Sequence, residues 1–189
     1  PEAGAKGTSL ILVEADREGF SRGRNLDKIG QNSADTSELF FNDVRVPMTN
    51  CLGEENKGFI YLMSQLPQER LSIAISAQAG AQRAFDEAVK FVKERKAFGK
   101  TVWDFQNTQF MLADMATDLE AARALLYLAA CKVSAGAPDK SRFSAMAKRL
   151  ATDSGSKIVN DVIAAEQRLD DGTVACAHGQ TIKDRKSVV

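Results

Sequence analysis

The sequence comprises 189 residues with 25 basic and 25 acidic side chains, so its formal net charge is zero. This balance disfavours nucleic acid as the main partner, because neutralising phosphates requires an excess of Lys and Arg. No apolar run approaches the roughly 20 residues that span a bilayer. Three scattered cysteines and one histidine disfavour a disulfide scaffold and a metal site, and favour a reducing intracellular compartment.

Residues 1–53 have the pattern of β structure. We expect a buried strand at Thr8–Ala15, which contains an uninterrupted apolar run, and a second strand at Ser37–Pro47, whose second half alternates polar and apolar residues. A third strand is expected between them at Arg22–Ile29. The chain starts at Pro1 without Met, so we interpret it as the interior of a longer protein with the true N-terminus missing.

From Glu54 onward the apolar residues recur with a helical period. A first helix is expected before Pro67, which either starts a new helix or kinks this one. The next runs from Leu71 to Arg95. Its expected apolar face consists of Ile73, Ala77, Ala81, Phe85, Ala88 and Val92.

Two further helices follow. One begins at Asp104 or Phe105 and ends at Ser134, with an apolar stripe formed by Met111, Met115, Leu119, Ala122, Leu126 and Ala129. The other begins at Asp139 or Ser141 and ends near Ile163, with apolar residues Phe143, Met146, Ala147, Leu150 and Ile158.

These patterns predict an α+β fold, in which a partial β-sheet or β-barrel segment precedes an antiparallel helical bundle. The predicted domains are 1–53, the end of a β domain, and 54–163, part of a helical domain. Residues 164–189 form a divergent tail whose last residues resemble a translated sequencing adapter, so we expect a read-through or a frameshift there.

The most informative motif is Glu94-Arg95-Lys96-Ala97-Phe98-Gly99-Lys100, followed by Gln106. By itself it describes a helix that ends in a charged turn with Gly99 as its C-cap. As a whole it resembles the flavin-contacting turn of the acyl-CoA dehydrogenases. Further blocks occur in that family's order: Lys28 to Gln31, Phe41 to Pro47, Leu52 to Phe59, Gln68 to Leu71, Gln109, and Ala147-Lys148.

The resemblance implies an oxidoreductase of fatty-acid or branched-chain oxidation that dehydrogenates acyl-CoA thioesters with FAD. It also implies electron transfer to an electron-transfer flavoprotein, a homodimer or homotetramer, and a bacterial cytoplasmic or mitochondrial matrix location. A flavin-dependent acyl-CoA oxidase of the same fold is an alternative, distinguished by rapid reoxidation of the reduced enzyme in air. A helical interaction module without chemistry is another.

Glu69 is the candidate catalytic base, because it matches the carboxylate that long-chain and isovaleryl-type members supply from this helix. A desolvated carboxylate has a raised pKa, which suits proton abstraction. Most other members supply the base from a later loop, and an ordinary surface Glu paired with Arg is the plainer interpretation. Arg70 matches the Arg beside the base that helps form the acyl-CoA site, or it is structural.

Arg95, Phe98 and Gln106 match the residues that contact the flavin cofactor of a neighbouring subunit. A guanidinium suits the pyrophosphate, because it presents a planar set of donors. Phe98 instead covers the helix end in the plainer interpretation. Near Ala164 the sequence departs from the family's Gln-x-x-Gly-Gly-x-Gly-Tyr, so we expect a fragment that by itself neither holds flavin nor turns over.

Overall fold

A computed structural model describes residues 4–167, 174–175 and 181–182, with side chains described as far as Ile163. The chain divides into two compact units, Pro1–Ser64 and Gln65–Val189. The domain boundary predicted at residue 53 stays a prediction. Most of the predicted tail lies outside the described residues, apart from the short antiparallel pair β5 (Val174–Ala175) and β6 (Thr181–Ile182).

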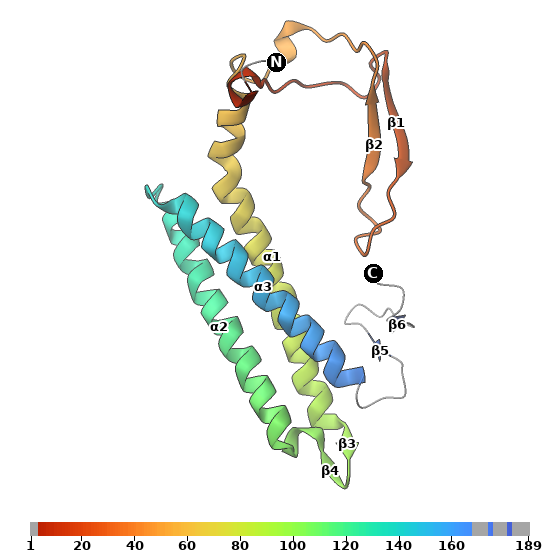
Figure 1. Ribbon diagram of the computed structural model, residues 1–189, viewed down its shortest axis with the longest axis vertical. Coiled ribbons are helices and arrows are strands. Elements are labelled where there is room, and N and C mark those ends of the chain that lie inside the picture. Colours follow the sequence, from red (N-terminus) through yellow and green to blue (C-terminus); the bar gives the residue numbers. More distant parts are fainter. Residues whose placement is uncertain (1–3, 168–173, 176–180, 183–189) are drawn as a thin grey trace. The chain divides into compact units, whose positions relative to one another are not determined.

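The first unit contains a two-stranded antiparallel sheet, β1 (Phe20–Asn25) and β2 (Ser37–Phe41) (Figure 1). Gly19 precedes β1 with a φ of +85°, and a Cβ there would lie 2.1 Å from the carbonyl oxygen of Asn42. Only glycine fits this close approach. β2 ends at Phe41, so the strand predicted to continue to Pro47 is too long. The chain turns at Asp43, whose φ is +50°.

The buried strand predicted at Thr8–Ala15 is wrong in its burial. This segment forms one isolated antiparallel bridge, between Ile11 and Cys51, supported by backbone hydrogen bonds from Leu12 to Asn50 and from Leu52 to Leu10. Ile11 and Leu12 are 54% and 57% exposed. An extended segment is buried only when other segments pack on its faces. This segment pairs through one isolated bridge, so its apolar side chains stay exposed. Short 3₁₀ turns at Gly4–Gly7 and Met48–Asn50 complete this unit.

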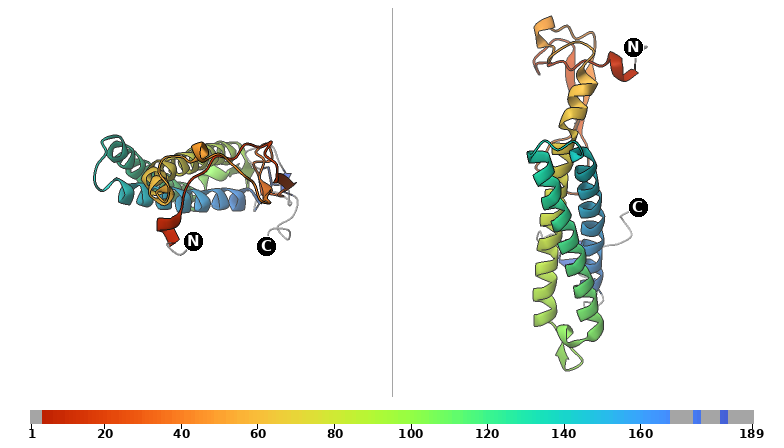
Figure 2. Two further views of the ribbon diagram at one scale, coloured as in Figure 1. Left: turned by 90° about the horizontal axis from the view of Figure 1, so that it is seen from above. Right: turned by 90° about the vertical axis from the view of Figure 1, so that its left-hand side faces the viewer.

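The second unit is built from long helices: most of α1 (Gly58–Glu94), α2 (Gln106–Ser134) and α3 (Lys140–Gln167). They lie side by side with alternating direction (Figures 1 and 2). This confirms the predicted antiparallel helices. Pro67 lies inside α1, so the helix continues through it. None of the described helices is both long and apolar enough to cross a membrane.

The apolar stripe predicted for α2 is nearly the observed one. Buried residues of this helix are Leu112, Met115, Leu119, Ala122, Leu126 and Ala129. Leu112 therefore takes the place predicted for Met111, which is only partly buried against the core.

The face predicted for α1 needs a larger correction. Ile73 is 48% exposed, whereas Leu71 and Ala74 are buried. Gln78 is also buried, and its side-chain amide donates a hydrogen bond of 3.1 Å to the carbonyl oxygen of Leu119 on α2. A buried amide requires such a partner. The buried face thus includes a polar residue that apolar periodicity does not show, whereas Ala81, Ala88 and Val92 are buried as predicted.

Small residues bring α3 close to its neighbours. Ser144, Ala147, Ala151 and Ile158 of this helix are fully or almost fully buried. Met146, predicted as apolar lining, is instead 46% exposed. The buried face of α3 is thus lined chiefly by small side chains, which allow close helix packing.

Candidate functional site

A tight hairpin joins α1 to α2. Its strands, β3 (Lys96–Ala97) and β4 (Lys100–Thr101), pair antiparallel with Lys96 opposite Thr101 and Ala97 opposite Lys100. The loop is therefore Phe98-Gly99, with φ of +52° and +84°. Positive φ at both positions is the pattern of a type I′ turn, which matches the twist of the strands.

Gly99 is therefore not a helix C-cap, contrary to the sequence prediction. α1 ends at Glu94, and Gly99 supplies the second loop position of the hairpin. The glycine is used for the same conformational reason in both cases, because it adopts positive φ without steric cost. Sequence alone therefore does not separate the two roles.

Phe98 stands out at the tip of this hairpin. Its side chain is 96% exposed and its backbone is left-handed, a rare conformation for a bulky residue that often marks functional sites. The ring meets Phe105 edge-on, with 6.4 Å between ring centroids. Phe98 therefore does not cover the end of α1, as the plainer interpretation of this residue required.

Arg95 and Gln106 flank the hairpin. Arg95 is half-buried, and its carbonyl oxygen accepts a hydrogen bond of 2.9 Å from the Val102 amide. Gln106 is the exposed first residue of α2. The hairpin thus brings the backbones around Arg95, Phe98 and Gln106 to one end of the helical unit. Whether their side chains share one surface stays a prediction.

Cationic side chains surround the same hairpin. The Lys93 ammonium lies 4.8 Å from the centroid of the Trp103 ring, and the Lys100 ammonium lies 4.2 Å from that of Phe105. Both distances suit cation–π contacts. Together with Arg95, these groups give the hairpin a basic character. This donor set fits an anionic nucleotide, because guanidinium and ammonium groups bind phosphate oxygens.

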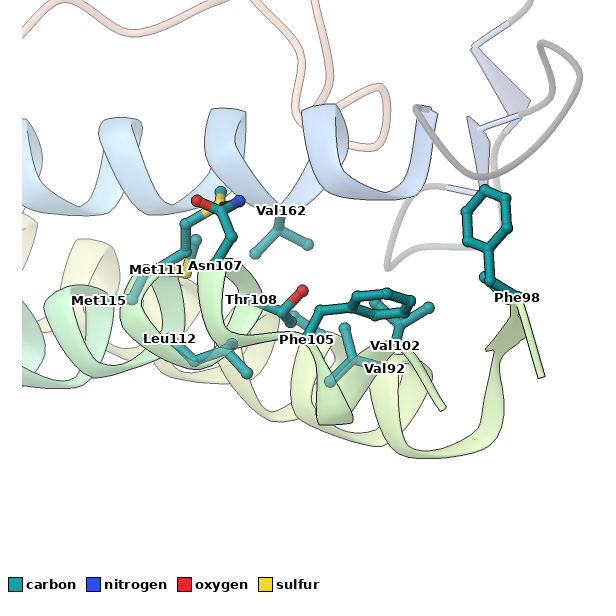
Figure 3. Close-up of a pocket in the computed structure, with 12 residues that line it drawn as sticks. Val92, Phe98, Val102, Phe105, Asn107, Thr108, Met111, Leu112, Met115 and Val162 are labelled. Atoms are coloured by element: carbon teal, nitrogen blue, oxygen red, sulfur yellow. Dashed lines mark hydrogen bonds between the residues drawn. The ribbon is translucent and has the colours of Figure 1, made fainter. Parts of the chain in front are cut away.

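An apolar cavity of about 310 Å³ opens beside the hairpin (Figure 3). It is lined by residues of all three helices and the hairpin: Ala88, Val92, Ala97, Phe98, Val102, Phe105, Asn107, Thr108, Met111, Leu112, Met115 and Val162. Phe98 lies at the edge of the cavity. Phe105 and Val102 were not predicted as site residues from the sequence. Their apolar character immediately before α2 was the available signal.

Glu69 and Arg70 lie on α1, far from this hairpin. Glu69 is exposed and Arg70 half-buried, and no side chain of the described residues forms an ion pair with Glu69. The desolvated environment expected for Glu69 is absent from the described part of the chain. Between Glu69 and the end of α1 the helix extends about 38 Å, at 1.5 Å per residue. The two groups of candidate residues therefore cannot line one small-molecule site within one chain.

Comparison with known proteins decides the family. The family model described as acyl-CoA dehydrogenase, C-terminal domain, matches residues 56–165. The chain belongs to the acyl-CoA dehydrogenase family. The family expected from the sequence is thereby confirmed, and the matched segment contains Glu69, Arg70, Arg95, Phe98 and Gln106.

Relatives in this family include both mitochondrial and bacterial proteins. The pig mitochondrial long-chain specific acyl-CoA dehydrogenase is 52% identical over 122 residues, covering 65% of this chain and 28% of that protein. The caffeyl-CoA reductase-Etf complex subunit CarC of Acetobacterium woodii is 42% identical over 169 residues, covering 89% of this chain and 43% of the relative. The chain therefore spans less than half the length of these acyl-CoA dehydrogenase relatives.

Solved structures of the family have the same architecture. The acyl-CoA dehydrogenase of Geobacillus kaustophilus is 42% identical with a TM-score of 0.83, covering 87% of this chain and 43% of that one. An FAD complex of PigA is 27% identical with a TM-score of 0.82, covering 87% and 43%. The predicted α+β class with a helical bundle is confirmed by these acyl-CoA dehydrogenase-like neighbours. They are oxidoreductases of a flavoprotein family.

Proposed function

We propose that the chain is part of an FAD-dependent acyl-CoA dehydrogenase of fatty-acid or branched-chain oxidation, most similar to the long-chain type. The family match across residues 56–165, which contains all five candidate residues, carries this proposal. The pig long-chain enzyme among the relatives supports the subclass. The Etf complex named for CarC supports an electron-transfer flavoprotein as electron acceptor.

Glu69 is the proposed catalytic base. Its carboxylate removes the α-proton of the acyl-CoA thioester, and the electron pair of that C–H bond forms the α,β double bond as the β-hydrogen leaves as hydride. Bound FAD supplies the two-electron acceptor for that hydride. Arg70, one residue further on α1, helps to form the acyl-CoA site. Substrate and further protein segments covering Glu69 exclude water, which makes a carboxylate a stronger base.

Arg95, Phe98 and Gln106 are the proposed cofactor contacts. The guanidinium of Arg95 suits the pyrophosphate of FAD, and the exposed ring and amide of Phe98 and Gln106 suit its adenosine half. The length of α1 between Glu69 and the hairpin supports two separate sites. In a homodimer or homotetramer, one copy then supplies the base while its neighbour supplies the hairpin. Mitochondrial and bacterial relatives support a mitochondrial matrix or bacterial cytoplasmic location.

The test is the rate of flavin reduction in the complete FAD-loaded protein. Glu69→Gln preserves size and removes proton acceptance, so reduction by acyl-CoA should slow on the order of 10² to 10⁴-fold. Binding of FAD and acyl-CoA should stay nearly intact. Anaerobic stopped-flow absorbance of the flavin measures the rate.

Glu87→Gln is the matched control, because it makes the same chemical change on the same helix at a half-buried Glu paired with Arg83. Its reduction rate should equal that of the parent protein. A parent-like rate in Glu69→Gln would move the base to another carboxylate, and with it the subclass.

A further inference from the structure

Asp104 ties the hairpin to the start of α2. Its Oδ2 accepts hydrogen bonds from both the backbone amide of Thr101, at 2.9 Å, and the Thr101 hydroxyl, at 2.6 Å. Thr101 is the last residue of β4, and Asp104 ends the 3₁₀ turn η3 (Val102–Asp104). One carboxylate oxygen thus connects the strand that follows Phe98 to the turn that leads into Gln106.

The hairpin needs such an anchor. It contains only two residue pairs, and an isolated two-stranded hairpin is marginally stable in water even when it is longer. Its tip also carries Phe98 in a left-handed conformation with an exposed ring. This conformation costs free energy, and it persists only where neighbouring interactions hold it.

Further bonds act in the same short segment. The amide of Val102 donates to the Arg95 carbonyl at 2.9 Å, and the side-chain amide of Gln109 donates to the Trp103 carbonyl at 3.2 Å. The bonds from Thr101 hold the pKa of the Asp104 carboxyl below its ordinary value, so the carboxylate stays charged. The connection from hairpin to helix is therefore fixed at several points, with Asp104 at its centre.

We propose that Asp104 is a positioning residue for the nucleotide half of the cofactor. Its Oδ2 is engaged by the two bonds from Thr101, so we assign it no contact with the cofactor. It acts by fixing the Phe98 loop and the N-terminus of α2, with Gln106, at a constant separation. This proposal rests on the proposed cofactor site and assigns a role to a residue outside it.

The test compares binding of FAD and of FMN to the complete apoprotein. FMN lacks the AMP half of FAD, which is the adenosine and its phosphate, so contacts to that half distinguish the two ligands. Asp104→Ala should weaken FAD binding about tenfold, because free energy comparable to one charged hydrogen bond must then be spent on ordering the hairpin upon binding. FMN binding should not change. Thr101 caps the turn Val102–Asp104, and Asp104 is the third residue after this cap. Asp104→Glu should restore the affinity for FAD relative to FMN, because Glu at this position also bonds back to the cap.

A double-mutant cycle with Phe98→Ala tests whether Asp104 affects FAD binding through the Phe98 loop. If Asp104 acts through the Phe98 loop, Asp104→Ala should add little to the loss already caused by Phe98→Ala. Asp153→Ala removes an exposed carboxylate paired with Arg149 and serves as the control with unchanged FAD binding. Additive losses in the cycle, or equal weakening of FAD and FMN, would overturn the proposal.

The outcomes separate this proposal from the proposed function. If neither Phe98→Ala nor Arg95→Ala weakens FAD binding, the cofactor site itself is misplaced. If those variants weaken FAD binding and Asp104→Ala does not, only the positioning role fails. Should Asp104→Ala not fold, Thr101→Val replaces it, because it removes the hydroxyl donor and leaves the backbone amide bond. Thr101→Val should likewise lower the affinity for FAD relative to that for FMN.

Discussion

Glu14 shows how single side chains hold the first unit together. Its carboxylate accepts hydrogen bonds of 2.7 and 3.0 Å from the Arg17 guanidinium and of 3.1 Å from the Asn50 amide. Asn50 also donates to the Leu12 carbonyl at 2.9 Å. Glu14 therefore joins two segments that are far apart in the sequence, although both are largely exposed.

The pKa of Glu14 should consequently be low. The hydrogen bond from Arg17, followed by that from Asn50, lowers this pKa from 4.5 to about 2. A lowered folded-state pKa means that the stabilisation is complete above pH 4.5 and is lost as the pH falls towards about 2. An NMR titration of the Glu14 carboxyl carbon should show its midpoint near the lower value. Asn50→Ala should move the midpoint upward, and a midpoint near 4.5 in the parent chain would contradict these contacts.

At the scale of elements, the contact between α1 and α3 depends on small side chains. A Cβ at Gly155 of α3 would lie 3.4 Å from the Ala77 carbonyl oxygen and 3.5 Å from the Ala81 Cβ of α1. A methyl group just fits, whereas a longer side chain requires the helices to separate. The neighbouring Ala151 is almost fully buried, so the site has no space to spare.

Substitutions at this glycine should therefore depend strongly on size. Gly155→Leu should destabilise the chain by about 1–3 kcal/mol through overpacking. Gly155→Ala should be close to neutral, because a helix-propensity gain of up to about 1 kcal/mol offsets the tight contact. Urea denaturation followed by circular dichroism measures both changes.

Gly80 on α1 is the matched control. A Cβ there would meet nothing within 4 Å, so Gly80→Leu should be neutral or stabilising by up to about 1 kcal/mol. Equal destabilisation at positions 80 and 155 would show that helix propensity, rather than the α1–α3 contact, decides the outcome.

At the scale of the whole molecule, the helical unit exposes much apolar surface. Exposed large side chains on its helices include Ile73, Ile75, Phe110, Tyr127 and Leu128. Surfaces of this kind mark interaction sites in native proteins and promote aggregation when they are uncovered. The observation agrees with the expected homo-oligomer and with a chain that spans less than half the length of its relatives.

The chain should consequently self-associate in solution. Sedimentation velocity at micromolar concentrations should show species larger than the monomer. A variant that combines Ile73→Gln, Phe110→Gln and Tyr127→Gln should shift the distribution towards monomer, because it reduces the exposed apolar area. A monodisperse monomer with a sharp cooperative melt in the parent chain would contradict this expectation.

The sequence by itself determined the helices and the family. Long runs with a helical period define their own hydrogen bonds within the segment, so α2 and α3 were predictable to within a few residues. The stripe of α2 was predictable for the same reason. The helices expected before Pro67 and from Leu71 to Arg95 are one continuous helix, α1. The ordered motif blocks around Glu69-Arg70 and Arg95 to Gln106 identified the family, because such motifs depend on residue identity and spacing rather than on contacts.

Only the tertiary structure decided burial, the hairpin and the separation of the candidate residues. Whether Leu12 or Ile73 is buried depends on which segments cover it, and local periodicity does not contain that information. Gly99 fits a helix cap and a hairpin loop equally well, so only the observed backbone pairing shows that it lies in the hairpin loop. The bonds of Asp104 to Thr101 likewise depend on a turn geometry that the sequence leaves open. Helical periodicity is local, whereas burial, turn type and distances between sites arise from contacts between distant segments.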